Sequence, residues 1–289
     1  MKKWTLSLLA AGLLTAPATQ AQELPDASPR QKLEQDVGLT AFTVNYSRPG
    51  KKERAIFGGL VPFGEIWRTG ANKATTISFD TPVIFQGEEI PAGRYSLFTK
   101  PGEETWTVIF NKDTDLWGTG DYDPEKDVAR LEVKTQSVES TENLTIGFDK
   151  LRTQGAHFFI KWERTGVFIP LEVPTMRTAM RNIEEALAEA EEAKKWRVYR
   201  NAAGFYHNNE LDPEKALDYM KQSLERNEES WYSHWLHAEI LASMDSYDDA
   251  VNAARQAMEI GKTQAEEDDG SFPYAKRIEE GIRRWKEKS

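Results

Sequence analysis

The chain of 289 residues contains no cysteine. Disulfide frameworks, thiolate metal sites, cysteine nucleophiles and lipid anchors on an N-terminal cysteine are therefore excluded. Long apolar runs are also missing beyond the N-terminal segment, and a bilayer-spanning helix needs about 20 apolar residues in succession. We therefore expect no membrane span, and we expect the fold to be stabilised by packed apolar cores.

Positive charge is scarce as well. The chain carries 37 lysine and arginine residues against 47 aspartate and glutamate residues, a formal net charge of −10. A protein that binds nucleic acid needs a basic face that neutralises phosphates and releases their counterions. The composition therefore predicts no nucleic-acid partner.

Motifs for nucleophilic and cofactor chemistry are absent too. The sequence has no Gly-x-Ser-x-Gly elbow, no phosphate-binding glycine loop and no dinucleotide fingerprint. We expect no cofactor, and a binding protein is favoured over an enzyme.

The first 21 residues have the three parts of a secretory signal peptide. Lys2 and Lys3 supply a positive start, Trp4 to Leu14 form a short apolar run, and Thr19-Gln20-Ala21 is a small-x-small cleavage site. The mature chain is predicted to begin near Gln22 and to be periplasmic or secreted.

From Leu39 to Val173, within a first predicted domain of residues 22–173, apolar and polar residues alternate as is typical of half-buried strands. Turn residues such as Gly87, Pro101 and Gly155 separate the alternating segments, and no helical segment lies between them. An all-β sandwich or jelly roll is predicted for this range. The segments are 42–46, 77–79, 95–97, 106–110, 131–133, 144–148, 158–162 and 167–171.

The pattern becomes helical after Pro174, and residues 174–289 form a second predicted domain. Gly204 and Ala238 are small residues 34 positions apart, as are Ala216 and Ala250. This is the period of tetratricopeptide repeats, in which small residues let paired helices approach closely. We predict an all-α, tetratricopeptide-like region of two degenerate repeats between a leading helix and a capping helix.

Several short motifs follow one another in the first domain. They are Ser47-Arg48-Pro49, Ile56-Phe57-Gly58, Leu60-Val61-Pro62-Phe63-Gly64, Trp67-Arg68-Thr69-Gly70-Ala71-Asn72, Pro91-Ala92-Gly93-Arg94-Tyr95-Ser96-Leu97-Phe98 and Trp117-Gly118. Together they make the domain resemble domain-of-unknown-function family 2911, exported proteins found mainly in Bacteroidetes-like bacteria, some with a helical repeat tail. The resemblance implies export and a compact domain, and it implies no activity.

Arginines, an asparagine and aromatic residues lie in these glycine-rich motifs. Arginine forks beside aromatic rings suit carboxylates, sugars and peptides, so a glycan or peptide ligand is predicted here. The alternative is that the arginines bind loop carbonyls and the tryptophans fill the ends of the sandwich. The candidate ligand-binding residues are Arg48, Trp67, Arg68, Asn72, Trp117 and Tyr122.

Two groups of residues raise the question of a metal ion. Carboxylates from Asp121 to Glu132 match part of a calcium-loop template, but Lys126 occupies the position that requires glycine. An acidic surface turn is the favoured interpretation. His234 and His237 share one helical face and would need His207 or a carboxylate to complete a site. We predict no metal.

The helical region carries its own candidate surface. Stacked helix pairs form a curved face that commonly binds a peptide or a protein, and the predicted partner-binding residues are Tyr206, His207, Trp231 and His234. Two hypotheses for the whole chain result. The first is a non-catalytic envelope protein that binds a glycan or peptide and docks a partner. The second is a hydrolase or lyase that uses Glu65, Asp121 or Asp127 as acid and base.

Overall fold

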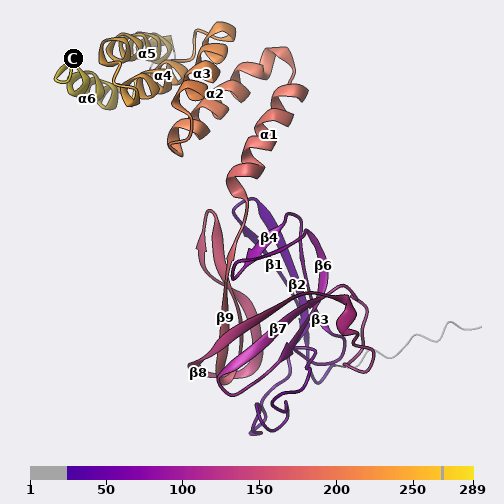
Figure 1. Ribbon diagram of the computed structural model, residues 1–289. Coiled ribbons are helices and arrows are strands. Elements are labelled where there is room, and N and C mark those ends of the chain that lie inside the picture. The colour runs from indigo at the N-terminus through magenta and orange to yellow at the C-terminus, as the bar shows by residue number, and fades with distance from the viewer. Residues whose placement is uncertain (1–24, 268–269) are drawn as a thin grey trace, which may run out of the picture. The chain divides into compact units, whose positions relative to one another are not determined.

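The computed structural model describes residues 25–267 and 270–289 (Figure 1). The predicted signal peptide lies outside the described residues. Contacts between residues divide the chain into two compact units, and the division falls between Val173 and Pro174. We call them the β domain and the helical domain. Within the described ranges, no helix is both long enough and apolar enough to cross a membrane.

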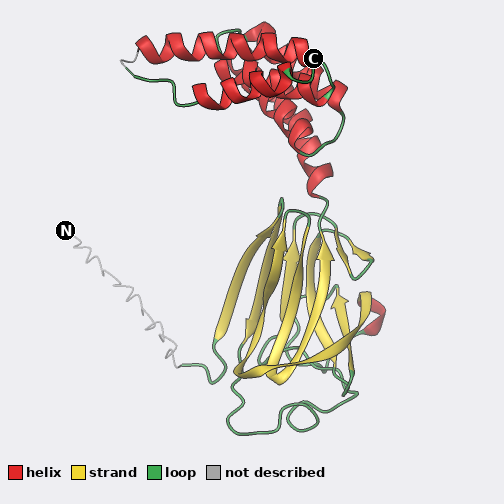
Figure 2. Cartoon of the chain, turned by 90° about the vertical axis from the view of Figure 1, so that its left-hand side faces the viewer, coloured by secondary structure: helices red, strands yellow, loops and turns green. Residues whose placement is uncertain are grey.

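The β domain is a nine-stranded antiparallel sheet with the strand order β1-β2-β3-β6-β7-β8-β9-β4-β5. Figure 2 shows the strands in yellow and the loops that join them in green. The strands are β1 (Arg30–Val37), β2 (Thr40–Ser47), β3 (Thr75–Phe79), β4 (Val83–Phe85), β5 (Glu88–Ile90), β6 (Gly93–Lys100), β7 (Thr105–Asn111), β8 (Asp127–Arg152) and β9 (Gly155–Glu172).

The long strand β8 belongs to two layers of the sheet. Its first part pairs with β7 as far as Lys134, and its second part pairs with β9 from Thr135 onward. The ring centroids of Phe42 on β2 and Phe148 on β8 are 5.0 Å apart, and those of Phe85 on β4 and Phe110 on β7 are 4.9 Å apart. The inner faces of the two layers therefore enclose one apolar core, as in a sandwich.

Alternate residues on the strands supply this core, as their sequence pattern indicates. In β2, Phe42 and Val44 are buried, whereas Ala41 is exposed. The side chains of Phe158 and Ile160 in β9 are also fully buried. The prediction of an all-β domain followed by an all-α domain is confirmed.

Three strands have no counterpart among the predicted segments. The edge strand β1 has mostly polar residues. Only Val37, at its end, is buried in the core, and the partly buried Leu33 packs against the core, so no apolar alternation marks the strand. The short strands β4 and β5 form a hairpin. Its two turn residues, Gln86 and Gly87, have φ angles of 52° and 88°, as a tight two-residue turn requires.

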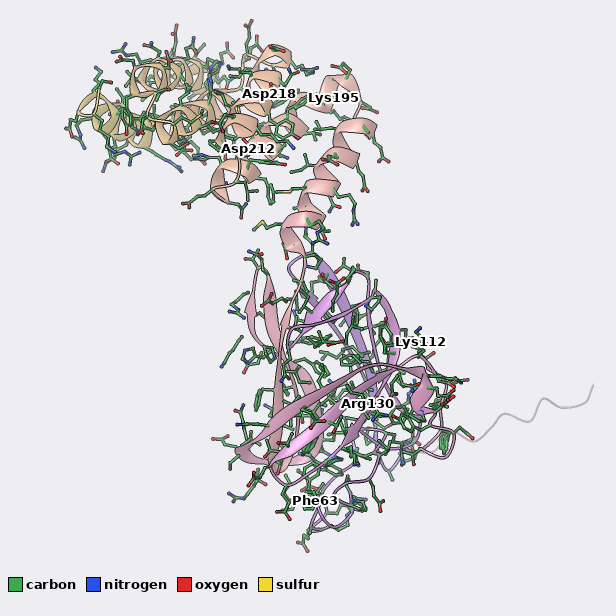
Figure 3. The ribbon with its side chains drawn as sticks, in the orientation of Figure 1. Phe63, Lys112, Arg130, Lys195, Asp212 and Asp218 are labelled. Carbon is green, nitrogen blue, oxygen red and sulfur yellow. The ribbon has the colours of Figure 1, made fainter. Side chains whose placement is uncertain are left out.

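One long loop projects from an end of the sheet (Figure 1). It connects β2 to β3 and comprises residues 48–74. Leu60 and Phe63 on this loop are exposed apolar side chains, and Figure 3 labels Phe63 beyond the end of the strands. We call this segment the β2–β3 loop.

The helical domain consists of helices that pack mainly against their neighbours in sequence. They are α1 (Thr175–Glu189), α2 (Glu192–Asn208), α3 (Pro213–Arg226), α4 (Trp231–Ser243), α5 (Tyr247–Glu267) and α6 (Ala275–Lys286). Asp212 caps α3 by accepting a hydrogen bond from the backbone N–H of Lys215, with Pro213 in the first turn. Ser230 caps α4 in the same way.

The helix starts agree with the 34-residue spacing seen in the sequence. Helix α3 begins at Pro213 and α5 begins at Tyr247. Ala216 on α3 and Ala250 on α5 are both fully buried. Assignment to the tetratricopeptide class stays a prediction.

Candidate functional site

A cavity of about 310 Å³ lies beneath the β2–β3 loop. We call it the loop cavity. Its wall comes from the segment before β1, from three parts of the loop and from β9, so residues far apart in sequence meet there. The lining residues are Ala27, Ser28, Pro49, Gly50, Lys52, Arg54, Leu60, Val61, Trp67, Arg68, Gly70, Ala71 and Trp162.

Hydrogen bonds hold the part of the loop that forms the wall of the cavity. The backbone of Trp67 exchanges two hydrogen bonds with Thr99 on β6, with N···O distances of 2.7 and 2.9 Å. The indole N–H of Trp67 donates to the carbonyl oxygen of Gly70 over 3.0 Å. Thr75 donates its hydroxyl proton to the carbonyl of Thr69. The loop is therefore fixed to the sheet beside the cavity.

Aromatic rings form the inner wall of the cavity. Trp67 stacks on Trp162 with ring centroids 6.0 Å apart and an interplanar angle of 20°. Phe57 and Trp106 contact Trp67 edge-on. Trp67 is only 9% exposed and Trp162 only 1% exposed. These rings serve as an apolar wall, because too little of either ring faces solvent to act as an open stacking platform.

Arg68 differs from the other polar side chains of the loop. Its Nε atom is buried and has no hydrogen-bond partner among the described residues. The side chain lines the loop cavity and is partly exposed. A buried donor without a partner loses its hydration without compensation, and such donors are rare in folded proteins. The described residues thus provide no acceptor for this guanidinium group, which belongs to a side chain on the cavity wall.

Two further cations stand on the wall, and both are exposed. Arg54 donates to the carbonyl oxygens of Lys51 and Gly50 over 3.0 and 2.6 Å, which fixes its guanidinium group while leaving its charge unpaired. Lys52 forms no side-chain ion pair within the described part of the chain. No aspartate or glutamate is among the lining residues, so the cavity carries a positive local charge in a protein with a net negative charge.

Left-handed backbone conformations are concentrated in the same loop. Lys52, Thr69 and Asn72 have φ angles of 50°, 56° and 60°. Such angles are sparsely populated by non-glycine residues and cost of order 1–3 kcal/mol each. Asn72 suits this conformation because its short polar side chain tolerates it. Backbone strain of this kind tends to accumulate at ligand sites.

Two of the predicted ligand residues lie outside the cavity wall. Arg48 donates from Nε to the carbonyl oxygen of Leu144 and from Nη2 to the hydroxyl of Thr145, each over 3.0 Å. Asn72 donates to the hydroxyl of Ser47 over 3.4 Å. Arg48 thus attaches the end of β2 to β8.

Tyr122 and Trp117 are also separate from the cavity wall. Asp127 on β8, with a side chain only 7% exposed, accepts hydrogen bonds from Asn111, Tyr122 and Arg130. Burial and the hydrogen bond to Asp127 raise the pKa of Tyr122 to about 12. Trp117 is 67% exposed and lies opposite Lys73 in an isolated bridge. The structure therefore brings together only Trp67 and Arg68 of the six predicted residues.

In the acidic turn, the carboxylates of Asp123 and Glu132 each bind a different partner. Asp123 caps a short 3₁₀ helix (Pro124–Lys126), and Glu132 accepts a hydrogen bond from the Thr107 hydroxyl. Among residues 25–267 and 270–289, no three histidine or carboxylate side chains are arranged to hold a metal ion. Asp127 already accepts three hydrogen bonds, which leaves it poorly placed to act as a general base. Glu65 and Asp121 are exposed.

The predicted partner-binding residues occupy separate parts of the helical domain. Tyr206 is 5% exposed and packs in the core between α2 and α3, and with His207 it lines a cavity of about 600 Å³. His234 lines another cavity of about 540 Å³, and its Nε2 lies 2.9 Å from the carbonyl oxygen of Glu228. Trp231 packs against Phe272 and Tyr274.

The cavity beside His234 has an acidic wall. Glu228, Glu229, Glu259 and Glu267 line it together with His234. His237, on the same helix as His234, is largely buried, and burial lowers its pKa to about 4.

Sequence reasoning missed Lys52, Arg54 and Trp162 as wall residues. The pair Lys51-Lys52 followed by Arg54, between Pro49 and the glycine-rich motif, was a readable signal of local positive charge. Trp162 gave no such signal, because it belongs to an alternating strand and reaches the cavity only through the pairing of β8 with β9.

Comparison with known proteins returned one family. Residues 28–171 match the model of the family described as "Protein of unknown function (DUF2911)". The matched range covers nearly the whole β domain and stops before the helical domain. No curated protein matches the chain.

Proposed function

We propose that the β domain, whose residues 28–171 match the DUF2911 family of proteins of unknown function, is the ligand-binding part of an exported, non-catalytic binding or scaffolding protein. The ligand is a glycan or peptide segment held in the loop cavity, and the helical domain docks a protein partner. Export rests on the predicted signal peptide at residues 1–21.

The unpartnered guanidinium group of Arg68 is the observation that carries this proposal. A loop that served packing alone would pair its buried polar groups, as Arg48 does at the neighbouring strand end. The β2–β3 loop instead leaves Arg68 unpaired in a cavity whose wall is fixed to β6. A preorganised wall reduces the entropy that binding must overcome.

The partner surface of the helical domain is supported by the cavities beside His207 and His234. Each is lined by residues of more than one helix, as expected where stacked helix pairs leave grooves. The wall around His234 is acidic, which favours a partner segment that carries lysine or arginine.

We do not propose the hydrolase or lyase alternative. Its mechanism needs two carboxylates that flank a bound substrate, and none of the described wall residues of the loop cavity is a carboxylate.

A glycan and peptide array tests the proposal. The chain without its predicted leader, residues 22–289, is applied beside the variants Arg68→Ala and Arg164→Ala. Arg164 is an exposed arginine on β9 outside the cavity wall and serves as a matched control. We expect the wild-type chain and Arg164→Ala to retain the same ligands, and Arg68→Ala to lose them. Ligands retained equally by all three proteins would place binding elsewhere, and an empty array would contradict the binding function.

A further inference from the structure

We propose that the loop cavity recognises an oxyanion, a carboxylate or phosphate group of its ligand, and that Arg68 is the residue that binds it. This inference rests on the proposed binding function of the β domain and adds the chemical class of the ligand.

The first argument is the balance of charge around the cavity. Lys52, Arg54 and Arg68 contribute three positive charges to the wall, and no carboxylate among the described residues lines it. In a partly enclosed site, each unit charge acts more strongly on a ligand than it would in bulk water. A neutral ligand would leave these charges uncompensated, whereas an anion would neutralise part of them.

The second argument concerns two acidic residues, on β8 and β9, that contact this segment. Glu163 lies 3.5 Å from the ammonium group of Lys51 and accepts a hydrogen bond from the backbone N–H of Ile56. Glu142 accepts a hydrogen bond from the backbone N–H of Lys52 over 3.0 Å. Both carboxylates are thus engaged by other groups, and neither forms an ion pair with the side chains of Lys52, Arg54 or Arg68.

The third argument is the shape of the donor. A guanidinium group presents its N–H donors in a planar fork that matches the two oxygens of a carboxylate or phosphate. The fork of Arg54 already serves two loop carbonyls. The fork of Arg68 is unused by the described residues, and its Nε is shielded from water. Arg68 is therefore the main anion-binding group, and Lys52 and Arg54 attract the anion by charge.

Three probes that share one sugar ring test this inference. Glucose is neutral, glucuronate carries a carboxylate at the same carbon, and glucose 6-phosphate carries a phosphate there. Each is titrated into residues 22–289 by calorimetry and by tryptophan fluorescence, with Trp67 on the cavity wall as a reporter. Acetate and inorganic phosphate form parallel arms that show whether the anion alone suffices. The variants are Arg68→Ala, Arg68→Lys and the control Arg164→Ala.

We expect at least one charged sugar to bind about tenfold or more tightly than glucose, because charge-assisted bonds to an arginine fork exceed neutral ones. Arg68→Ala should abolish this preference, Arg68→Lys should restore part of it, and Arg164→Ala should leave it unchanged. The charged sugar that binds more tightly, glucuronate or glucose 6-phosphate, shows whether the site prefers a carboxylate or a phosphate.

Three results would overturn the inference. Equal binding of glucose and the charged sugars, or ligands on the array that are all neutral, would keep the loop cavity as a binding site and reject its anion preference. A charge preference that survives in Arg68→Ala would assign the effect to general electrostatics. An array without ligands would reject the proposed function itself.

Discussion

Arg48 and Arg68 are arginines of the same segment with opposite surroundings. Arg48 spans the carbonyl of Leu144 and the hydroxyl of Thr145 with two hydrogen bonds of 3.0 Å. The side chain of Arg68 has no hydrogen-bond partner among the described residues and lines the loop cavity. The first arginine supports the fold, and we assign the second to the ligand.

The thermal unfolding of two variants measures this difference. Arg48→Ala leaves two acceptors on β8 without their donor, and we expect it to lose about 1–3 kcal/mol of stability. Arg68→Ala removes no hydrogen bond within the described chain, so its stability should change by less than about 0.5 kcal/mol. If Arg68→Ala melts as low as Arg48→Ala, Arg68 has a structural role and the assignment to the ligand is wrong.

His237 predicts a pH dependence for the helical domain. Burial, with smaller contributions from His234 and Lys221, lowers its folded-state pKa from 6.5 to about 4, and only Asp249 opposes this shift. In the unfolded chain the imidazole of His237 is therefore protonated below about pH 6.5, whereas in the folded chain it is protonated only below about pH 4. Its contribution to stability is complete above pH 6.5 and is lost as the pH falls toward 4.

Urea unfolding at pH 7.5 and pH 4.5, followed by helical circular dichroism, checks this effect. After allowance for partial solvent exposure, the shift corresponds to about 2 kcal/mol. When the pH falls from 7.5 to 4.5, the free energy of unfolding should decrease by about 2 kcal/mol less in His237→Gln than in the wild type. Identical losses in the two proteins would show that His237 titrates normally in the fold.

At the scale of elements, steric contacts explain why the β2–β3 loop has glycine at positions 58 and 59. A Cβ on Gly59 would lie 2.6 Å from the backbone oxygen of Ala55. Gly58 has a φ angle of 81°, and a Cβ there would lie 2.7 Å from the ring of Phe63. Side chains at either position would displace the turn that presents Leu60 and Phe63.

Gly59→Ala and Gly120→Ala form a matched pair for this element. A Cβ on Gly120 would contact nothing within 4 Å. We expect Gly59→Ala to destabilise the β domain by about 1–3 kcal/mol, as overpacking does, and Gly120→Ala to change it by less than about 0.5 kcal/mol. The midpoint of denaturant unfolding followed by tryptophan fluorescence reports both values. Equal midpoints would mean that the loop adjusts without cost.

Alternation in the sequence predicted the inner strands because each has one buried face. It placed a break between Val133 and Leu144, but the structure has the single strand β8 there. No glycine or proline separates these residues, so the missing turn signal was itself informative. The edge strand β1 was not predicted, because it is held mainly by its backbone pairing with β2 and buries few apolar side chains.

The candidate site was predictable to the extent that its residues are close in sequence. Trp67 and Arg68 share one motif, and both line the loop cavity. Trp117 and Tyr122 come from another loop, and no sequence pattern showed that they lie outside the wall of the loop cavity. Local composition identifies polar loops, whereas tertiary packing decides which loops meet.

At the scale of the whole molecule, the chain is divided between Val173 and Pro174. Each unit has its own apolar core, with Phe42 and Phe158 in the first and Trp235 and Ala254 in the second. We therefore expect each unit to fold alone.

Residues 22–173 and 174–289, expressed separately, test this expectation. The first fragment should give β-type circular dichroism and the second α-type, and each should unfold cooperatively. Their summed spectra should reproduce that of residues 22–289. An unfolded fragment from a chain that folds when intact would show that the two cores depend on each other.

The central claim is that the loop cavity is the ligand site of the β domain. The most direct measurement is a ¹H–¹⁵N NMR titration of residues 22–289 with the strongest ligand from the array, observing the indole N–H and arginine Nε–H signals. We predict that the signals of Trp67 and Arg68 shift and saturate together, while that of Trp117, exposed outside the cavity wall, stays in place. A saturating shift of Trp117 with unchanged Trp67 and Arg68 signals would contradict the claim.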